Sequence, residues 1–125
     1  MLSTRELPIT IRDEGPCTVV AVGGELDVYS ALLLRTSLLD AIASGRTCLV
    51  LDLSTVDVLD FSALRVLTRV RRRLQVLHGS LDIVVARPVL AELFRVTALD
   101  RVFALHASVD AALAAHRKPA TQTVA

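Results

Sequence analysis

Aromatic residues are scarce in this sequence: it has no tryptophan, one tyrosine and three phenylalanines, together 3% of 125 residues. Sites that bind single-stranded nucleic acid stack the bases on aromatic side chains, so this composition argues against such binding. Net charge of one sign is also lacking, because 14 lysines and arginines stand against 13 aspartates and glutamates. Without a strong positive charge, no overall field attracts nucleic acid or anionic lipid.

Long apolar runs are missing as well. A membrane-spanning helix needs about 18 consecutive apolar residues, and no such run occurs in the chain. The initial residues, MLSTRELPITIRDE, lack the apolar core of a signal peptide. We therefore expect a cytoplasmic protein that does not enter the membrane.

Cysteine is nearly absent. The two cysteines, Cys17 and Cys48, both lie in predicted strands, and we interpret them as small buried apolar residues. The sequence around them has no histidine-rich segment of the kind that a zinc site needs. We therefore predict no metal site.

Motifs of catalysis and cofactor binding are lacking too. The chain has no GxxxxGK[ST] or GxGxxG sequence for binding phosphates, and Ser62 is not part of a GxSxG turn. His78 follows Ser62 by about four helical turns, which is more than about 20 Å along a helix. His106 reaches Ser62 only if the fold brings it there. We therefore predict neither an enzyme nor a cofactor.

Apolar residues make up 53% of the chain, which is ample for the core of one domain. Their spacing predicts a hairpin followed by alternating strands and helices, as in an α/β fold with a mixed, largely parallel sheet and about four helices. We expect one domain at 8–116, an extension at 1–7 and a disordered tail at 117–125. The expected strands are 8–12, 17–23, 49–53, 81–86 and 102–105, and the expected helices are 30–43, 60–77, 88–96 and 108–116.

Two turns are predicted near the middle of the chain. Gly23 and Gly24 are expected to end the second strand, and a short polar turn is expected between the strand 49–53 and the helix that follows. Asp60 is well placed to cap that helix by accepting backbone N–H bonds. Side chains in these two turns are expected to lie at the surface.

Ser62 lies in the first turn of that helix, where the helix dipole favours negative charge. Its hydroxyl is a plausible phosphate acceptor, and it is equally an ordinary feature of a helix start. Phe61 either extends the apolar stripe of the helix, which is the interpretation we favour, or makes an exposed contact with a partner.

Charged residues gather in two sets. The basic set on the same helix is expected mainly to face solvent, with docking of an acidic protein partner as the second interpretation. The acidic set, near strand ends and helix starts, is expected to cap helices and shape turns rather than to bind metal. The basic residues are Arg65, Arg69, Arg71, Arg72 and Arg73, and the acidic residues are Asp27, Asp52, Asp57 and Asp60.

Three segments in this order resemble the STAS-domain anti-sigma factor antagonists of bacteria. They are GELDVYSA from Gly24, LVLDLSTVDVLDFSALRVL from Leu49, and LDIVVARPVLAELFRVTALDRVFALHASVDAALAA from Leu81. Each is a weak signal alone, and their order and spacing together are a strong one. The match spans residues 8–116. Where the family commonly has Asp-Ser-Ser-Gly, this chain has Asp-Phe-Ser-Ala from Asp60.

The resemblance implies a single STAS domain that binds an anti-sigma factor, itself a serine kinase with a GHKL-type ATP-binding fold, and so frees a sigma factor. Phosphorylation of Ser62 would end that binding, and a serine phosphatase would restore it. The family precedent is a monomer or weak dimer. Two alternatives stay open: an interaction scaffold whose serine is never modified, and a small-ligand-binding α/β domain. The implied partner-binding residues are Glu25, Leu26, Asp27, Asp60, Phe61, Ser62, Ala63 and Arg65.

Overall fold

Strands and helices alternate after an initial hairpin in the computed structural model, which describes residues 7–117. The elements are β1 (Ile9–Glu14), β2 (Cys17–Leu26), α1 (Val28–Ala43), β3 (Cys48–Leu59), α2 (Phe61–Val76), β4 (Ser80–Val84), α3 (Pro88–Val96), the short 3₁₀ helix η1 (Leu99–Arg101), β5 (Ala104–His106) and α4 (Val109–His116). The strands form one sheet in the order β1-β2-β3-β4-β5, in which β1 and β2 are antiparallel and the other neighbours are parallel. This confirms the predicted mixed, largely parallel sheet with an N-terminal hairpin.

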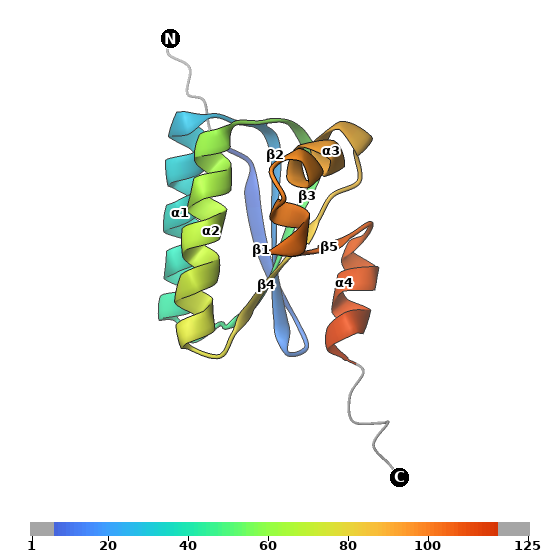
Figure 1. Cartoon of the computed structure of the whole chain (residues 1–125). Coiled ribbons are helices and arrows are strands. Elements are labelled where there is room, and N and C mark those ends of the chain that lie inside the picture. The colour runs from blue at the N-terminus through green and yellow to red at the C-terminus, as the bar shows by residue number, and fades with distance from the viewer. Residues whose placement is uncertain (1–6, 118–125) are drawn as a thin grey trace.

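Helices cover both faces of the sheet (Figure 1). α1 and α2 lie side by side on one face, and α4 lies on the other. Side chains along a strand point alternately to opposite faces. Accordingly, Leu49 and Leu51 of β3 join the core beneath α1 and α2, whereas Val50 packs with residues of α4. Because β3 is buried on both faces, its sequence is a nearly continuous apolar run.

The two central strands are longer than the sequence predicted. Gly23 and Gly24 do not end β2, which continues to Leu26 through a register shift beside β3. The predicted polar turn is also wrong, because β3 continues through it to Leu59. Gly23 is required within the strand, since a Cβ atom there would lie 2.9 Å from the Thr55 Oγ1 atom of β3. The additional residues carry both strands to one edge of the sheet, where α1 and α2 begin.

The remaining boundaries differ little from the predicted ones. α1 begins earlier than predicted, at Val28, and β4 ends earlier, at Val84. The last strand moves toward the C-terminus and ends at His106. α3 and α4 lie where they were predicted, and the Ser108 hydroxyl caps α4 by accepting a hydrogen bond from the backbone N–H of Ala111.

The ends of the chain were predicted to be an extension at 1–7 and a disordered tail at 117–125. Residues 1–6 and 118–125 lie outside the described part of the chain, so these stay predictions there. Leu7 is described, and it packs against the core. No helix within the described part is long and apolar enough to cross a membrane.

The interpretation of the cysteines as merely small apolar residues is wrong. Cys17 of β2 and Cys48 of β3 form a disulfide on the face of the sheet that α4 covers. The pairing follows from the strand register: Thr18 is paired with Leu49, so the residues before them also lie opposite each other, with Cα atoms 4.6 Å apart. The sequence does not reveal this contact, because 31 positions separate the two cysteines.

Candidate functional site

The candidate site lies where α1 and α2 begin. β2 and β3 are parallel neighbours, and Leu26 and Leu59 at their ends are paired in register. The backbone N–H of Asp60 donates to the carbonyl of Leu26 with an N–O distance of 2.9 Å, which ties the start of α2 to the end of β2. The two helices therefore begin side by side at the carboxyl edge of the sheet (Figure 1).

The start of α1 is closed by its own side chains. Asp27 accepts hydrogen bonds from the backbone N–H groups of Tyr29 and Ser30, at 3.0 and 2.9 Å. In return, the Ser30 hydroxyl accepts from the backbone N–H of Asp27 at 2.9 Å, which completes a capping box. The prediction that Asp27 has a capping role is confirmed.

The start of α2 is different. Asp60 occupies the N-cap position, but its side chain accepts no backbone N–H bond, so the predicted cap is wrong. The carboxylate instead accepts a hydrogen bond from the Ser62 hydroxyl, with an Oγ–Oδ2 distance of 3.2 Å. Because the carboxylate turns toward Ser62, the first-turn N–H groups of α2 lack this side-chain cap. The positive end of the helix dipole is thus next to a half-buried serine.

A groove between α1 and α2 borders Ser62. Its volume is about 350 Å³. The walls combine apolar side chains with three arginines, so an anion at Ser62 would meet positive charge from both helices. The lining residues are Val28, Ala31, Leu32, Arg35, Ser62, Arg65, Val66 and Arg69.

Apolar side chains are unusually exposed at the starts of α1 and α2. Phe61 is 64% exposed and Tyr29 is 75% exposed, so the favoured interpretation of Phe61 as part of the buried stripe is wrong. Phe61 is the first residue of α2. Its side chain lies outside the buried apolar stripe with which α2 packs against the sheet. Exposed apolar clusters of this kind mark interaction sites more often than isolated residues do. We use the term apolar patch for the exposed apolar residues at the two helix starts: Val28 and Leu32 line the groove beside Ser62, Tyr29 and Leu33 line a cavity beside β2, and Phe61 lines a cavity on the other side of α2.

Two of the predicted partner-binding residues are corrected by their burial. Leu26 and Ala63 are fully buried, because they point into the core between the sheet and the helices. Their side chains cannot reach a partner. Glu25 and Arg65, by contrast, are exposed at the same edge. Tyr29 and Leu32 were not among the predicted partner-binding residues. The signal for them is that the apolar residues of α1 form a set wider than one buried stripe, so some of them must be exposed.

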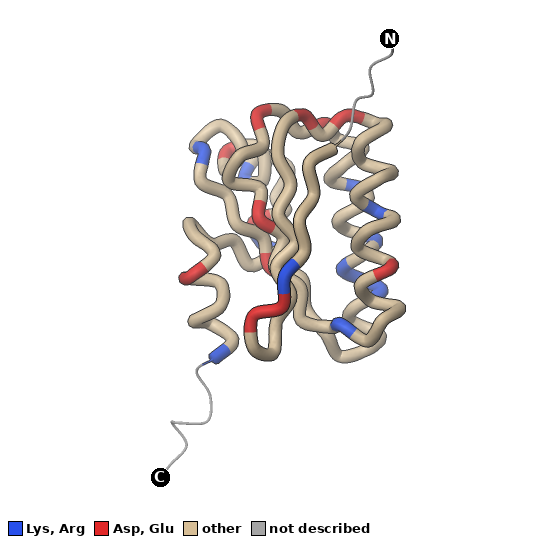
Figure 2. Tube along the Cα trace, turned by 180° about the vertical axis from the view of Figure 1, so that it is seen from behind, with Lys and Arg blue, Asp and Glu red and all other residues tan. Residues whose placement is uncertain are grey.

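Charge is distributed unevenly over this region. Figure 2 shows acidic segments along the edge where α1 and α2 begin, and basic segments farther along the two helices. Asp57 forms an ion pair with Arg87 at 3.1 Å, and Asp52 accepts from the backbone N–H of Ser54 at 2.9 Å. The arginines of α2 lie mostly in solvent, as predicted.

The imagined serine–histidine pair is not assembled within the described residues. Ser62 bonds to Asp60, whereas His106 bonds to Asp82 at 2.7 Å on β4. Asp82 and His106 belong to the sheet, far along the chain from the start of α2. Among residues 7–117, Ser62 therefore has a carboxylate as its partner and no general base of the histidine type.

Comparisons with known proteins agree on one family. The STAS domain model matches residues 8–112. The anti-sigma-F factor antagonist RsfB of Mycobacterium tuberculosis is 29% identical over 120 residues, which cover 90% of this chain and 92% of RsfB. A solved anti-sigma factor antagonist from Mycobacterium paratuberculosis is 30% identical with a TM-score of 0.81, over 91% of this chain and 97% of that one. The Bacillus cell fate determinant SpoIIAA in its phosphorylated form shares the fold, with 19% identity and a TM-score of 0.69 over 88% of this chain and 100% of that one.

Fold and site together define a small mixed α/β domain with an open apolar and basic surface at two adjacent helix starts. Within that class, the chain belongs to the STAS domain family. This confirms the family that the sequence resembles. The mycobacterial relatives carry the names of regulatory proteins, not of enzymes.

Proposed function

We propose that this protein is an anti-sigma factor antagonist, which binds an anti-sigma factor and thereby frees a sigma factor. The observation that carries the proposal is the set of exposed apolar side chains at the starts of α1 and α2, of which Val28 and Leu32 line the groove beside Ser62. The two mycobacterial relatives, which are similar over about nine-tenths of this chain, are antagonists by name. A protein partner is the ligand that best fits an exposed surface of this composition.

The partner would be held mainly by aromatic anchors. Tyr29 and Phe61 offer large, exposed rings, and buried aromatic side chains carry much of the binding energy in interfaces. Arg65 and Glu25 lie nearby and would form the polar rim that sets orientation and specificity. Asp27 caps α1 with its side chain, and Asp60 ties the start of α2 to β2 through its backbone N–H.

Ser62 would be the switch. Its hydroxyl lies at the uncapped start of α2, and the partner is proposed to be a serine kinase. Phosphate adds a charge of about −1.5 to −2, which the helix dipole favours by about 0.3–1 kcal/mol. Repulsion from Asp60, which now accepts the Ser62 hydroxyl, acts against this. The repulsion offsets part of the gain, so we expect α2 to stay folded.

The effect of phosphate would fall on the interface. Arg65 and Arg69 line the groove beside Ser62 and would pair with the new charge within this chain. These two arginines would then no longer be free to pair with acidic groups of the partner. A hydrated dianion would also lie among the apolar side chains that contact the partner. A partner that covers this dianion must remove its water, which costs several kcal/mol unless the partner supplies a further cation, and each 1.4 kcal/mol is about a tenfold loss of affinity. Phosphorylation would therefore dissociate the complex.

The remaining features of the proposal follow from the same function. A serine phosphatase would restore the active form, the protein would act in the cytoplasm, and it would be a monomer or weak dimer in the absence of its partner. The acting unit would be the domain at 8–116, most of which the family match covers.

The test uses the full chain, ATP and each candidate anti-sigma kinase from the same genome. One kinase should form a complex without ATP and, with ATP, transfer one phosphate to this protein, as measured by size-exclusion chromatography and mass spectrometry. Ser62→Ala should keep the complex and lose the phosphate. Ser108→Ala is the matched control, because Ser108 also begins a helix but lies at the start of α4, which packs on the other face of the sheet.

The other outcomes separate the alternatives. Stable binding without any phosphate transfer would favour the unmodified scaffold. Binding to none of the candidate kinases would contradict the antagonist function. A large loss of helical circular dichroism on phosphorylation would show that the switch acts by unfolding α2 and not through the interface.

A further inference from the structure

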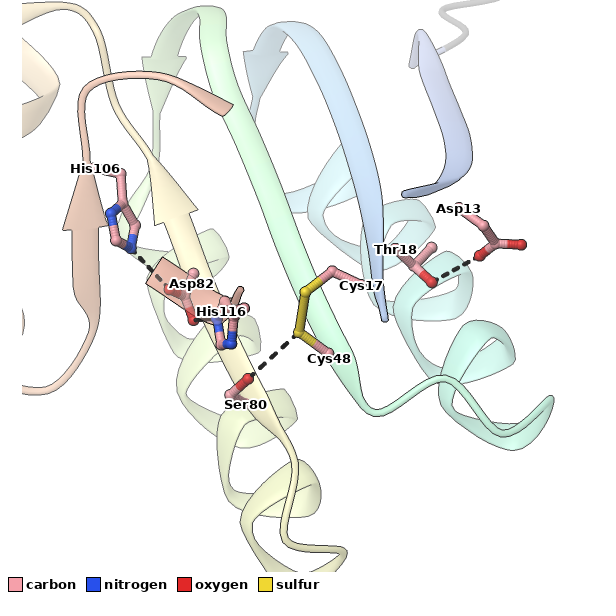
Figure 3. Close-up of a disulfide and its surroundings, with 8 residues drawn as sticks. All are labelled: Asp13, Cys17, Thr18, Cys48, Ser80, Asp82, His106 and His116. Atoms are coloured by element: carbon pink, nitrogen blue, oxygen red, sulfur yellow. Dashed lines mark hydrogen bonds and ion pairs between the residues drawn. A yellow bond between two sulfur atoms is a disulfide. The ribbon is translucent and has the colours of Figure 1, made fainter. Parts of the chain in front are cut away.

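The second place where reactive side chains meet is the α4 face of the sheet, at the end of β2 and β3 opposite to the candidate site. Alternate residues of neighbouring strands point to this face. The register places Cys48 beside Ser80, and Val50 beside Asp82, so all these side chains share one side with Cys17. Figure 3 shows the sulfur atoms of the disulfide next to Ser80, Asp82 and His116.

His116, the last residue of α4, completes a cluster of metal-ligating groups. One ligand atom from each of Cys17, Cys48 and His116 lies within 4.8 Å of the other two. Two thiolates and one imidazole are a ligand set that zinc prefers, and open zinc sites hold three protein ligands and one water. Metal–ligand bonds of about 2.0–2.3 Å place neighbouring ligands of a tetrahedral ion less than about 4 Å apart. Opening the disulfide and a small shift of the side chains would bring the three ligand atoms into that geometry.

The imidazole is already oriented by a buried carboxylate. Asp82, whose side chain is 8% exposed, bonds to His116 Nε2 at 3.0 Å with one oxygen and to His106 Nε2 at 2.7 Å with the other. When Nε2 carries the proton for this bond, Nδ1 keeps its lone pair for a metal ion. A carboxylate that receives the second ring N–H is the usual support of a zinc-bound histidine.

The sulfur atoms have similar support and access. The Ser80 hydroxyl donates a hydrogen bond to Cys48 Sγ at 3.9 Å. A cavity of about 240 Å³ opens beside Cys17 between the β1–β2 turn and the end of α4, which gives an ion a route to the cluster. Glu14 and Arg117 are among the residues that line it.

We propose that the reduced form of this protein binds one Zn²⁺ ion through Cys17, Cys48 and His116, with water as the fourth ligand. A dithiol reductant supplies two electrons and two protons, the sulfur–sulfur bond breaks, and two thiols form. Zn²⁺ then replaces the two thiol protons, which pass to solvent. The disulfide and the zinc complex exclude each other, because both use the same two sulfur atoms. In a reducing compartment, the zinc form would replace the disulfide.

The site is independent of the proposed anti-sigma binding. It lies on the other face of the sheet from α1 and α2, and none of its ligands borders the groove beside Ser62. Zinc would hold β2, β3 and the end of α4 together, as the disulfide holds β2 to β3. Failure of one inference therefore leaves the other standing.

The experiment titrates the full chain with Co²⁺ and Zn²⁺ after a phosphine has reduced the disulfide and been removed. The reduced protein should bind one Co²⁺ with a thiolate-to-metal charge-transfer band, and Zn²⁺ should displace it. Zn²⁺ should also raise the thermal unfolding midpoint above that in a chelator. The oxidised protein should show neither effect.

Variants assign the ligands. Cys48→Ser should abolish the charge-transfer band, or reduce it to that of a single thiolate, and His116→Asn should weaken binding at least about tenfold. Asp82→Asn, which keeps the side-chain shape, should weaken it by about ten- to a hundredfold. His78→Asn is the matched control, because His78 lies in the turn after α2, and it should bind like the native chain.

Two results would overturn the proposal. The first is a reduced native chain that binds Co²⁺ no more tightly than Cys48→Ser. The second is full affinity in His116→Asn. Circular dichroism of each metal-free variant shows whether it is folded, and mass spectrometry of the reduced native chain under non-denaturing conditions gives the zinc stoichiometry without any variant.

Discussion

Replacing Phe61 with alanine should weaken binding to the anti-sigma factor strongly while leaving the stability of the free protein nearly unchanged. The Phe61 side chain is 64% exposed, so it contributes little to the core. It is also the first residue of α2, where alanine is a better helix former than phenylalanine. We therefore expect the free energy of unfolding to change by less than about 0.5 kcal/mol, as for ordinary surface substitutions.

The loss of binding can be estimated from the exposed area. An aromatic side chain of about 200 Å² that is 64% exposed in the free protein offers about 130 Å² to a partner. At about 25 cal/mol per Å², complete burial of this area is worth about 3 kcal/mol. That energy corresponds to a dissociation constant about a hundredfold higher in the variant.

Isothermal titration calorimetry with the anti-sigma factor measures this difference directly. Val76→Ala is the matched control, because Val76 is 79% exposed on the same helix but at its other end. It should bind like the native protein. Native affinity in Phe61→Ala would refute the role of the apolar patch, and an equal loss in both variants would show that the contact is not confined to the start of α2.

Three further predictions concern stability. Reducing the disulfide, which links residues 31 positions apart, should lower the free energy of unfolding by about 3–4 kcal/mol in urea with a chelator present, and an unchanged midpoint would contradict this. Hydrogen bonds from Arg46 and then Thr18 lower the pKa of Asp13 to about 2. The contribution of Asp13 to the free energy of unfolding is therefore complete above about pH 4 and is lost as the pH falls toward about 2. NMR titration of the carboxyl group should find this pKa, and Arg46→Gln should raise it. Gly79→Ala would place a Cβ atom 2.3 Å from the carbonyl oxygen of Thr47, and should cost about 1–3 kcal/mol or more in thermal unfolding.

Much of the fold could be predicted from local patterns. Alternating apolar residues predict the first strand, nearly continuous apolar runs predict the buried parallel strands, and the period of 3.6 predicts the helices, which each turn one face to the core. Residue type alone predicts Asp27 or Ser30 at the start of α1 and Ser108 or Asp110 at the start of α4, and it is Asp27 and Ser108 that accept the capping hydrogen bonds. The order of three family segments also predicts the STAS fold, which the family match confirms.

The direction of individual side chains was less accessible to the sequence. Phe61 continues the helical spacing and yet lies outside, whereas Leu26 and Ala63 belong to the predicted surface and yet lie in the core. Where a strand passes into a helix, the side-chain period changes from two residues to 3.6. Neither spacing therefore predicts the direction of a side chain at the junction. The backbone path from β3 into α2 decides it. Asp60 illustrates the same limit, because it holds the N-cap position but bonds to Ser62.

The sequence by itself therefore determined the elements, their order and the family, since these depend on residues near one another in the chain. Only the tertiary structure brought Cys17, Cys48 and His116 together, since their contact depends on the register of β2 with β3 and on the placement of α4 over the sheet. Likewise, only the tertiary structure brought Leu32 of α1 and Ser62 of α2 to one groove. The pairing of β2 with β3 and the packing of α4 join segments that are far apart in the chain, so a local pattern does not show which residues will meet.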